Sequence, residues 1–177
     1  MDTQTEAEAA TTMDRTTIER TSEQELVVTR TIDGPRGVVF EAWTDAELFR
    51  QWWVPKSMGL TLLSCEVDAR VGGGYRLTFD IGTAEPMAFF GRYLEVSPPS
   101  RLVWTNEEGD GDAVVTTVTF DEQQGRTRLV VRDLYPSKDA LEAAIASGST
   151  AGWAEMLDQL DELLLELAAT QQRDADA

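Results

Sequence analysis

The chain has 177 residues, with 32 acidic and 15 basic side chains, no histidine and one cysteine. This length suits a single domain with a sizeable core, and the formal charge of -17 argues against binding to nucleic acid or to an anionic membrane. Without histidine, the chain cannot supply Ser-His or Cys-His catalysis or a histidine-ligated metal, and Cys65 cannot form an internal disulfide. We therefore expect no metal and no cofactor.

The two ends differ in composition from the rest. Residues 1–22 are mostly small, polar or charged, and so are residues 170–177. Such segments bury too little apolar surface to offset their ordering entropy, so we expect a disordered acidic leader and a disordered tail around one domain over residues 23–169. The start does not resemble a signal peptide, and no run of about 18 apolar residues is present. These features predict a cytoplasmic protein.

The first part of the domain predicts a strand followed by helix. Residues 23–32 are rich in β-branched side chains and end at the turn Asp33-Gly34-Pro35. Proline suits the first turn of a helix, and an apolar stripe continues through residues 38–53. We expect this helical segment to break near Thr44-Asp45, where either side chain can cap a second helix.

After Pro55 the hydrophobic pattern changes to a period of two. Turn residues separate the strand-like runs, and these short connections favour antiparallel neighbours. Together with the first strand they predict a seven-stranded antiparallel meander. The six runs are residues 60–68, 74–81, 87–96, 101–106, 113–121 and 126–134.

The last part predicts two helices. Ser137 can cap a short one over residues 138–146, and Ser149 or Thr150 can begin a longer one that reaches about Ala168. The long helix repeats apolar residues at spacings of three and four, so it must bury that stripe against the sheet. The fold class is therefore α+β: a helix-grip fold, in which a curved sheet wraps around a long C-terminal helix.

Six segments carry a more specific resemblance. In chain order they are TRTIDGPRGVVFEAWTDAELFRQWW, CEVDARVGGGYRL, FGRYLEVSPPSRLVWTNEE, TTVTF, TRLVV and GWAEMLDQLDELL. Over residues 26–164 the chain resembles the heat-shock protein 90 ATPase activator homologue family, part of the START-like or SRPBCC superfamily. It departs from that family at Val54, where a Trp-Trp-Gly-Pro turn is common.

The resemblance implies the fold strongly and the function weakly, because this superfamily includes ligand carriers, cyclases and chaperone activators. We expect a binding protein with a cavity between sheet and helix for a small hydrophobic or amphipathic molecule. One alternative is a chaperone-linked interaction protein, and another is an enzyme of the polyketide cyclase or hydrolase type. The oligomeric state, monomer or dimer, stays open, and so does a protein partner.

Large aromatic and methionine side chains are the main indication of a cavity, because ligand pockets are mostly apolar with a few polar anchors. In the strand over residues 74–81, Tyr75, Phe79 and Ile81 share the face expected to point inward. The strand over residues 87–96 allows two orientations: one buries Phe90 and Arg92, the other Phe89 and Tyr93. The predicted ligand-binding residues are Trp52, Trp53, Met58, Tyr75, Phe79, Phe90, Arg92, Trp104, Trp153 and Met156.

An inward Arg92 would need a carboxylate partner or an anionic ligand, so it is a candidate anchor for a ligand acid group. No catalytic residue is assigned. Glu66 and Asp68 share a strand face, but an exposed edge or pairing with Arg70 and Arg76 explains them as well. Residues 109–112, GDGD, favour a hairpin tip over a calcium loop. Residues 72–74, GGG, lack the features of a phosphate-binding loop.

Overall fold

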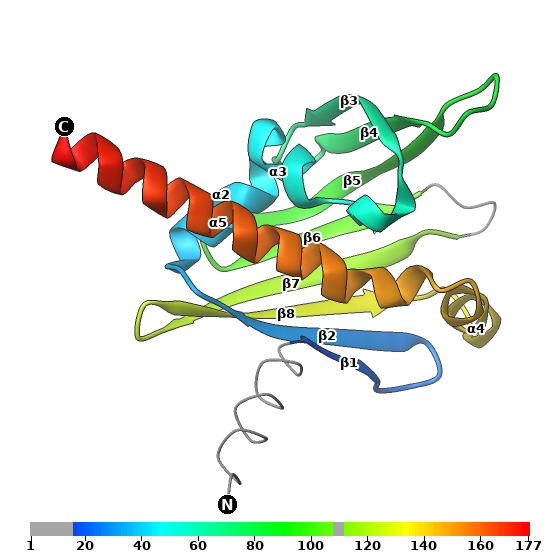
Figure 1. The fold of residues 1–177 in the computed structure, drawn as a ribbon. Coiled ribbons are helices and arrows are strands. Elements are labelled where there is room, and N and C mark those ends of the chain that lie inside the picture. Colours follow the sequence, from blue (N-terminus) through cyan, green and yellow to red (C-terminus); the bar gives the residue numbers. More distant parts are fainter. Residues whose placement is uncertain (1–15, 108–111) are drawn as a thin grey trace, which may run out of the picture.

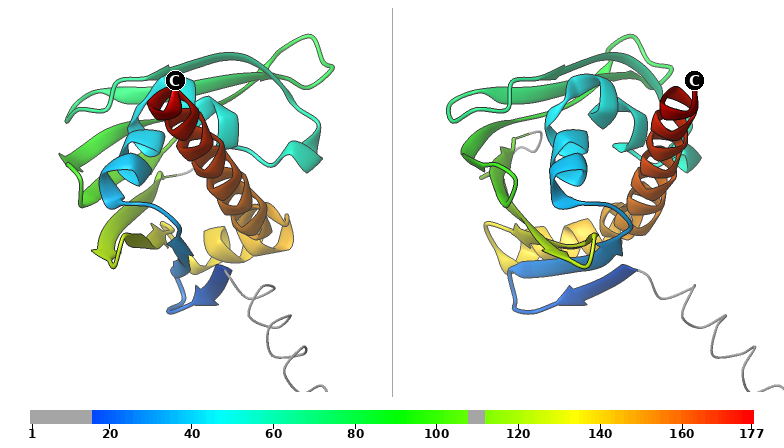
Figure 2. Two further views of the ribbon diagram at one scale, coloured as in Figure 1. Left: turned by 60° about the vertical axis from the view of Figure 1, so that its left-hand side comes forward. Right: turned by 90° about the vertical axis from the view of Figure 1, so that its left-hand side faces the viewer.

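The computed structural model describes residues 16–107 and 112–177, and it confirms the predicted α+β helix-grip fold (Figure 1). One antiparallel sheet with the order β1-β2-β8-β7-β6-β5-β4-β3 curves around the helices (Figure 2). Its strands are β1 Thr16–Arg20, β2 Glu25–Ile32, β3 Thr61–Val67, β4 Gly74–Asp80, β5 Met87–Ser97, β6 Arg101–Asn106, β7 Val114–Gln123 and β8 Arg126–Leu134. The helices are α2 Arg36–Thr44, α3 Ala46–Trp52, α4 Lys138–Ala146 and α5 Gly152–Asp176, with short 3-10 turns η1 Lys56–Met58 and η2 Ser149–Ala151.

The described sheet has eight strands instead of the seven predicted. The additional strand, β1, lies within the segment assigned to a disordered leader, and it pairs antiparallel with β2, with Ile18 opposite Val28. Without β1, the backbone N–H and C=O groups on one side of β2 would form an open sheet edge. Strand β1 is therefore ordered by its hydrogen bonds to β2, although its composition is polar. Residues 1–15 of the predicted leader lie outside the described residues.

The C-terminal end also differs from the sequence prediction. Helix α5 continues to Asp176, through the residues predicted to be a disordered tail. Residues 168–176 are exposed, so this last part of the helix adds no residue to the buried core. The predicted boundary therefore marks the end of the buried stripe rather than the end of the helix. None of the helices in the described chain combines the length and apolar character that crossing a bilayer requires.

The break between the first two helices is where the capping pattern predicted it. Asp45 is extended, and its carboxylate accepts hydrogen bonds from the backbone N–H groups of Glu47 (2.9 Å) and Leu48 (3.2 Å). These bonds satisfy donors that lack a partner inside the first turn of α3. The break turns the chain so that Phe49 and Trp52 enter the core beside Trp43.

Strand β5 connects the two halves of the sheet. Its first half pairs with β4 and its second half with β6, where the register shifts between Tyr93 and Glu95. At Gly91, β5 crosses close to β6: a Cβ atom there would lie 1.6 Å from the carbonyl oxygen of Thr105. A glycine is therefore required at this crossing, and together with the bulge it lets the sheet bend around α5.

Helix α5 lies across the concave face of the sheet (Figures 1 and 2). Its apolar stripe, including Leu157, Leu160 and Leu164, is buried, as the spacing predicted. Polar contacts fix the helix as well: Arg30 on β2 is almost fully buried and contacts Asp158 (2.6 Å) and Asp161 on α5. The inner face of β2 is therefore joined to the helix by charge as well as by apolar packing.

Candidate functional site

Aromatic rings fill the middle of the domain. Trp43 packs against Trp52, with ring centroids 4.6 Å apart, and against Trp104 at 5.7 Å. The space that remains among Trp43, Phe49, Tyr75, Tyr93 and Trp104 amounts to about 10 Å³. The centre of the fold is therefore core, and the apolar groove that we consider as a ligand site lies toward the amino-terminal end of α5.

A groove of about 640 Å³ opens at that end, and we call it the outer groove. The amino-terminal end of α5, the turn containing η1 and the start of β5 form its walls, and most of the wall is apolar. Its volume lies within the range of small-molecule sites, roughly 300–1,000 Å³. The large side chains that line it are Trp53, Met58, Met87, Phe89, Trp153 and Met156.

A second space of about 230 Å³, the inner hollow, shares Trp53, Ser149 and Trp153 with the outer groove as walls. Its remaining walls come from strands β6, β7 and β8 and from helix α4. In contrast to the outer groove, it is lined by several polar side chains. They are Asn106, Thr116, Asp133 and Tyr135.

These polar side chains belong to a directed hydrogen-bond chain. The Trp104 indole N–H and the Tyr75 hydroxyl both donate to Oδ1 of Asn106, at 3.2 and 2.6 Å. Because an indole N–H can only donate, this contact fixes the orientation of the Asn106 amide. Its Nδ2 then donates to Thr116 Oγ1 at 2.8 Å, and the Thr116 hydroxyl donates to Oδ1 of Asp133 at 2.5 Å. The chain therefore ends at a carboxylate that accepts.

Asp133 is fully enclosed at the wall of the inner hollow. Burial raises the pKa of its carboxyl to about 6, against the opposing effect of hydrogen bonds from Thr116 and Trp153. Burial also raises the pKa of Tyr135 to about 12, with a smaller contribution from the charge of Asp133. At neutral pH the hollow thus contains an ionised carboxylate beside a neutral phenol.

Two side chains of α5 hold the turn at the rim of the outer groove. Gln159 donates to the carbonyl oxygens of Trp52 (2.9 Å) and Val54 (3.1 Å) and accepts from the Lys56 N–H (2.8 Å). Glu155 accepts from the backbone N–H and the hydroxyl of Ser57, at 3.0 and 2.6 Å. The rim is therefore tied to the same helix that provides Trp153.

Val54 has the left-handed conformation that its position in the turn demands, with φ of 74°. This is where the resemblance would place a glycine, which adopts such a φ without steric cost. The turn keeps its shape at the cost of local strain, because a β-branched residue is a rare occupant of this region.

The ten residues predicted to bind a ligand fall into three groups. Four of them, Trp53, Met58, Trp153 and Met156, line the outer groove. Trp52, Tyr75, Phe79 and Trp104 are buried core residues, and three of these also have fixed polar partners: Trp52 donates to the carbonyl oxygen of Ala42, and Tyr75 and Trp104 donate to Asn106. The remaining two, Phe90 and Arg92, lie on the outer face of the sheet.

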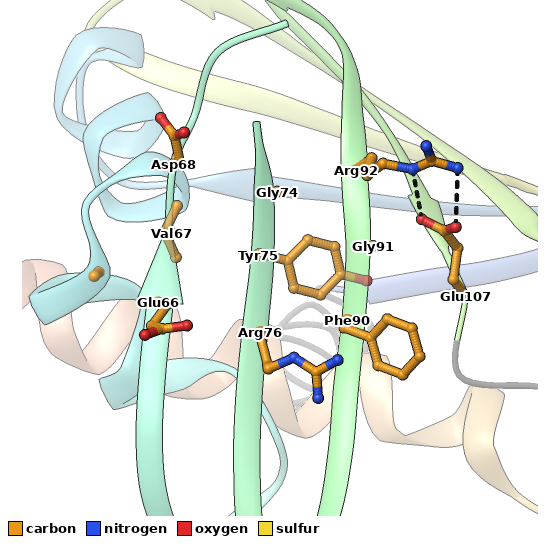
Figure 3. Close-up of a pocket in the computed structure, with 11 residues that line it drawn as sticks. Glu66, Val67, Asp68, Gly74, Tyr75, Arg76, Phe90, Gly91, Arg92 and Glu107 are labelled. Carbon is orange, nitrogen blue, oxygen red and sulfur yellow. Dashed lines mark hydrogen bonds and ion pairs between the residues drawn. The ribbon is translucent and has the colours of Figure 1, made fainter. Parts of the chain in front are cut away.

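The structure corrects the suggestion that Arg92 points inward. Phe89 and Tyr93 take the inner face of β5, so Arg92 points outward and pairs with Glu107 at 3.2 Å (Figure 3). Adjacent phenylalanines made both orientations of the strand plausible, and pairing with β4 and β6 decides between them. Ile81, also expected inside, is exposed where β4 has ended.

The outer face around Arg92 forms a shallow hollow of about 780 Å³ (Figure 3). Its charged groups are largely engaged with neighbours: Arg92 pairs with Glu107, and the Arg76 guanidinium lies 4.6 Å from the centre of the Phe90 ring. Asp68 pairs with Arg70 at 2.8 Å, as the sequence suggested. Although this hollow is larger than the outer groove, it is an open strand surface whose lining is less apolar than that of the outer groove, and we do not assign it as the site.

Sequence reasoning missed Asp133, although a signal for it existed. Strand β8 buries Thr127, Leu129 and Val131 at a spacing of two, and Asp133 is the next residue on that face. A carboxylate that continues an inward-facing apolar series is the exception that marks functional positions. Thr116 and Asn106 gave no comparable signal, because their role depends on the pairing of β6, β7 and β8.

Three further features lie at other positions. Cys65 is half-buried, and burial raises the pKa of its thiol to about 11, so the thiol stays protonated and unreactive at neutral pH. Residues 72–74 join β3 to β4, as predicted for a turn. Of the GDGD segment, residues 109–111 lie outside the described residues, so the prediction of a hairpin tip is untested.

A curved antiparallel sheet around a long C-terminal helix defines the chain as a START-like helix-grip protein. Residues 33–165 match the family model described as "Activator of Hsp90 ATPase homolog 1-like protein". The chain belongs to this family, as its sequence motifs indicated. A search of curated proteins found no significant match.

Solved structures share the fold. A protein from Rhodobacter sphaeroides matches with a TM-score of 0.77 and 22% identity, covering 86% of this chain and 99% of its own. Protein NE0264 from Nitrosomonas europaea matches with a TM-score of 0.74 and 24% identity, covering 85% of this chain and 99% of its own. Protein CV1439 from Chromobacterium violaceum is 30% identical, with a TM-score of 0.64 and coverage of 78% and 96%. At identities under 25% such likeness bears on fold alone.

Proposed function

We propose that this protein binds a small amphipathic molecule in the outer groove and the inner hollow. The observation that carries the proposal is that an apolar space adjoins a polar one. The outer groove, of about 640 Å³, shares Trp53 and Trp153 with the inner hollow, and the buried carboxyl of Asp133 lines that hollow. Apolar walls supply affinity through the burial of surface, and a few fixed polar groups orient the ligand.

A screen of amphipathic metabolites by NMR tests the proposal. A ligand in the groove is expected to shift the indole N–H resonance of Trp153. The indole of Trp52 is the internal control, because it is buried in the core and donates to the carbonyl oxygen of Ala42 at 2.9 Å. The proposal fails if no compound of a broad amphipathic set shifts Trp153, or if each compound shifts both indoles equally.

A variant that fills the outer groove tests whether the ligand binds there. Ala151 is exposed and lines the outer groove, so Ala151→Trp is expected to fill part of the groove and weaken binding at least 10-fold. Ala143→Trp is the matched control, because Ala143 is exposed on α4 and is not among the groove residues. Equal loss in both variants would place the ligand elsewhere.

An enzyme of the cyclase or hydrolase type is a second candidate, and Asp133 is the observation that favours it. A buried carboxyl with a pKa of about 6 at the wall of a hollow is suited to general acid–base work near neutral pH. Turnover of a ligand found in the screen, lost in Asp133→Asn while binding persists, would support this candidate. The chaperone-linked alternative rests on the family's description, and stimulation of an Hsp90-type ATPase tests it.

A further inference from the structure

The charged groups of the cavity are all of one sign. Among the described residues that line the outer groove and the inner hollow, the ionised side chains are Asp133 and Glu155, and neither lysine nor arginine is present. Arg92, the expected anchor for a ligand acid group, lies on the far side of the sheet. The site therefore offers a carboxylate head group no cation with which to pair.

Asp133 accepts a hydrogen bond from the Thr116 hydroxyl at 2.5 Å, and the Trp153 side chain also favours its charged form by lowering the pKa of the carboxyl. A carboxylate has about four acceptor positions, so it retains capacity for a donor that enters the hollow. The chain from Asn106 through Thr116 points its protons toward Asp133 and thereby stabilises a negative charge there. A protonated amine can supply both the missing donors and the compensating charge.

The walls next to Asp133 also suit a cation. Trp53 and Trp153 meet nearly at right angles, with ring centroids 5.5 Å apart and an interplanar angle of 85°, and Tyr135 provides a further ring in the hollow. Aromatic faces attract ammonium groups through the negative potential above the ring. Aromatic rings that enclose a space from two directions are a common binding site for a positively charged group.

The amino-terminal end of α5 also faces the groove, and its dipole by itself favours anions. Glu155 opposes this effect, because its carboxylate lies in the first turn of the helix and binds Ser57 at the rim. A helix end carries about half a unit of positive charge, so the full negative charge of Glu155 more than offsets it.

We propose that the cavity selects amphipathic amines, with the ammonium group bound at Asp133 between Trp53, Trp153 and Tyr135 and the apolar part in the outer groove. This inference rests on the proposed binding function and adds the charge of the ligand. Long-chain acids are excluded by the same features, because their carboxylates would face Asp133 across a hollow with no basic side chain among its described lining residues.

Calorimetry with three probes of equal chain length tests the proposal at pH 7.5: octylammonium, 1-octanol and octanoate, each as a monomer in solution. Octylammonium is expected to bind at one site and at least 10-fold more tightly than octanoate. In Asp133→Asn this preference is expected to fall below 3-fold, with 1-octanol affinity unchanged. Asp139→Asn, an exposed charge on α4, is the matched control for the general attraction of amines to an acidic protein.

Dependence on pH gives a second readout that needs no variant. Tyr135 is the one titratable group among the described residues that line the inner hollow with Asp133. The others are Trp53, Asn106 on β6, Val114 and Thr116 on β7, Ala144 on α4, Ser149, and Trp153 on α5. Octylammonium affinity is therefore expected to fall as the pH drops below about 6, while 1-octanol affinity stays constant.

Each result separates the two proposals. Binding of all three probes with equal affinity, or a preference for octanoate, would overturn the amine selectivity and leave the binding function standing. A preference that persists in Asp133→Asn but disappears in Asp139→Asn would assign it to surface charge and overturn the inference. No binding of any probe would count against the proposed function itself.

Discussion

Arg30 on β2 and Asp161 on α5 form an ion pair in which the side chains are only 2% and 13% exposed. Arg30 also contacts Asp158, whose side chain is 63% exposed. Removing a partner of a buried charge costs far more than removing an exposed one. We expect Asp161→Asn to lower the free energy of unfolding by about 2–3 kcal/mol and Asp158→Asn by less than about 1 kcal/mol, measured by urea denaturation. Equal losses would contradict this ranking.

Gln159 connects α5 to the rim of the outer groove through three hydrogen bonds to backbone groups. Gln159→Leu keeps much of the volume but leaves these groups without partners, so we expect a loss of about 2–3 kcal/mol of stability. Hydrogen exchange is expected to become faster at Lys56, whose N–H loses its acceptor. Gln159→Glu restores that acceptor, so protection at Lys56 should return in part. Unchanged exchange in the leucine variant would show that the rim is held by other contacts.

The strain at Val54 can be measured by comparing two small residues. Val54→Ala and Val54→Gly both remove the isopropyl group, but only glycine takes a φ of 74° without steric cost. We expect the glycine variant to be more stable than the alanine variant by about 1 kcal/mol. At an ordinary position in regular structure the order is reversed, so a more stable alanine variant would show that the turn is relaxed in solution.

Asp133 makes stability depend on pH. Burial raises the pKa of its carboxyl from 3.8 to about 6, so the folded protein holds the proton more tightly than the unfolded chain. The stabilisation from this proton is present below pH 4 and is lost as the pH rises through about 6, a change of about 3 kcal/mol. Asp133→Asn has no such proton. We expect its stability relative to the natural protein to increase between pH 5 and pH 8, as measured by thermal unfolding at each pH.

A flat difference between Asp133→Asn and the natural protein across this range would indicate that the carboxyl titrates alike in both states. Thr116→Val is a useful companion variant, because it removes the hydroxyl that donates to Asp133 at 2.5 Å. Loss of that donor is expected to raise the pKa of the Asp133 carboxyl further and to move the transition to higher pH.

Local signals predicted much of this fold. Asp45 and Ser137 cap helices where the sequence indicated, and the apolar stripe that includes Leu157 and Leu160 is buried. A cap depends on residues within one helical turn, and a buried stripe depends on the spacing along one helix. Both can therefore be predicted from the sequence alone. Strand β1 is different, because Ile18 is its one large apolar residue and its order comes from pairing with β2.

The site was less predictable than the fold. The sequence identified Trp53 and Trp153 as candidates but could not separate them from Trp52 and Trp104, which are core. Whether an aromatic ring fills a cavity or lines it depends on side-chain packing between distant elements. The inward series on β8 did contain the information for Asp133, since only the spacing of two had to be followed for one more residue.

All five tryptophans of the chain belong to one cluster, connected through Trp43 and Trp53. At ring separations of 4.6 to 6.3 Å, excitation of one indole passes readily to the others. Trp53 and Trp153 form the end of the cluster that lines the outer groove, so they can accept energy absorbed anywhere in the core and emit it beside any molecule bound there. The intrinsic tryptophan fluorescence of the protein can therefore report binding, because a molecule bound at this end of the cluster can change the emission of every tryptophan.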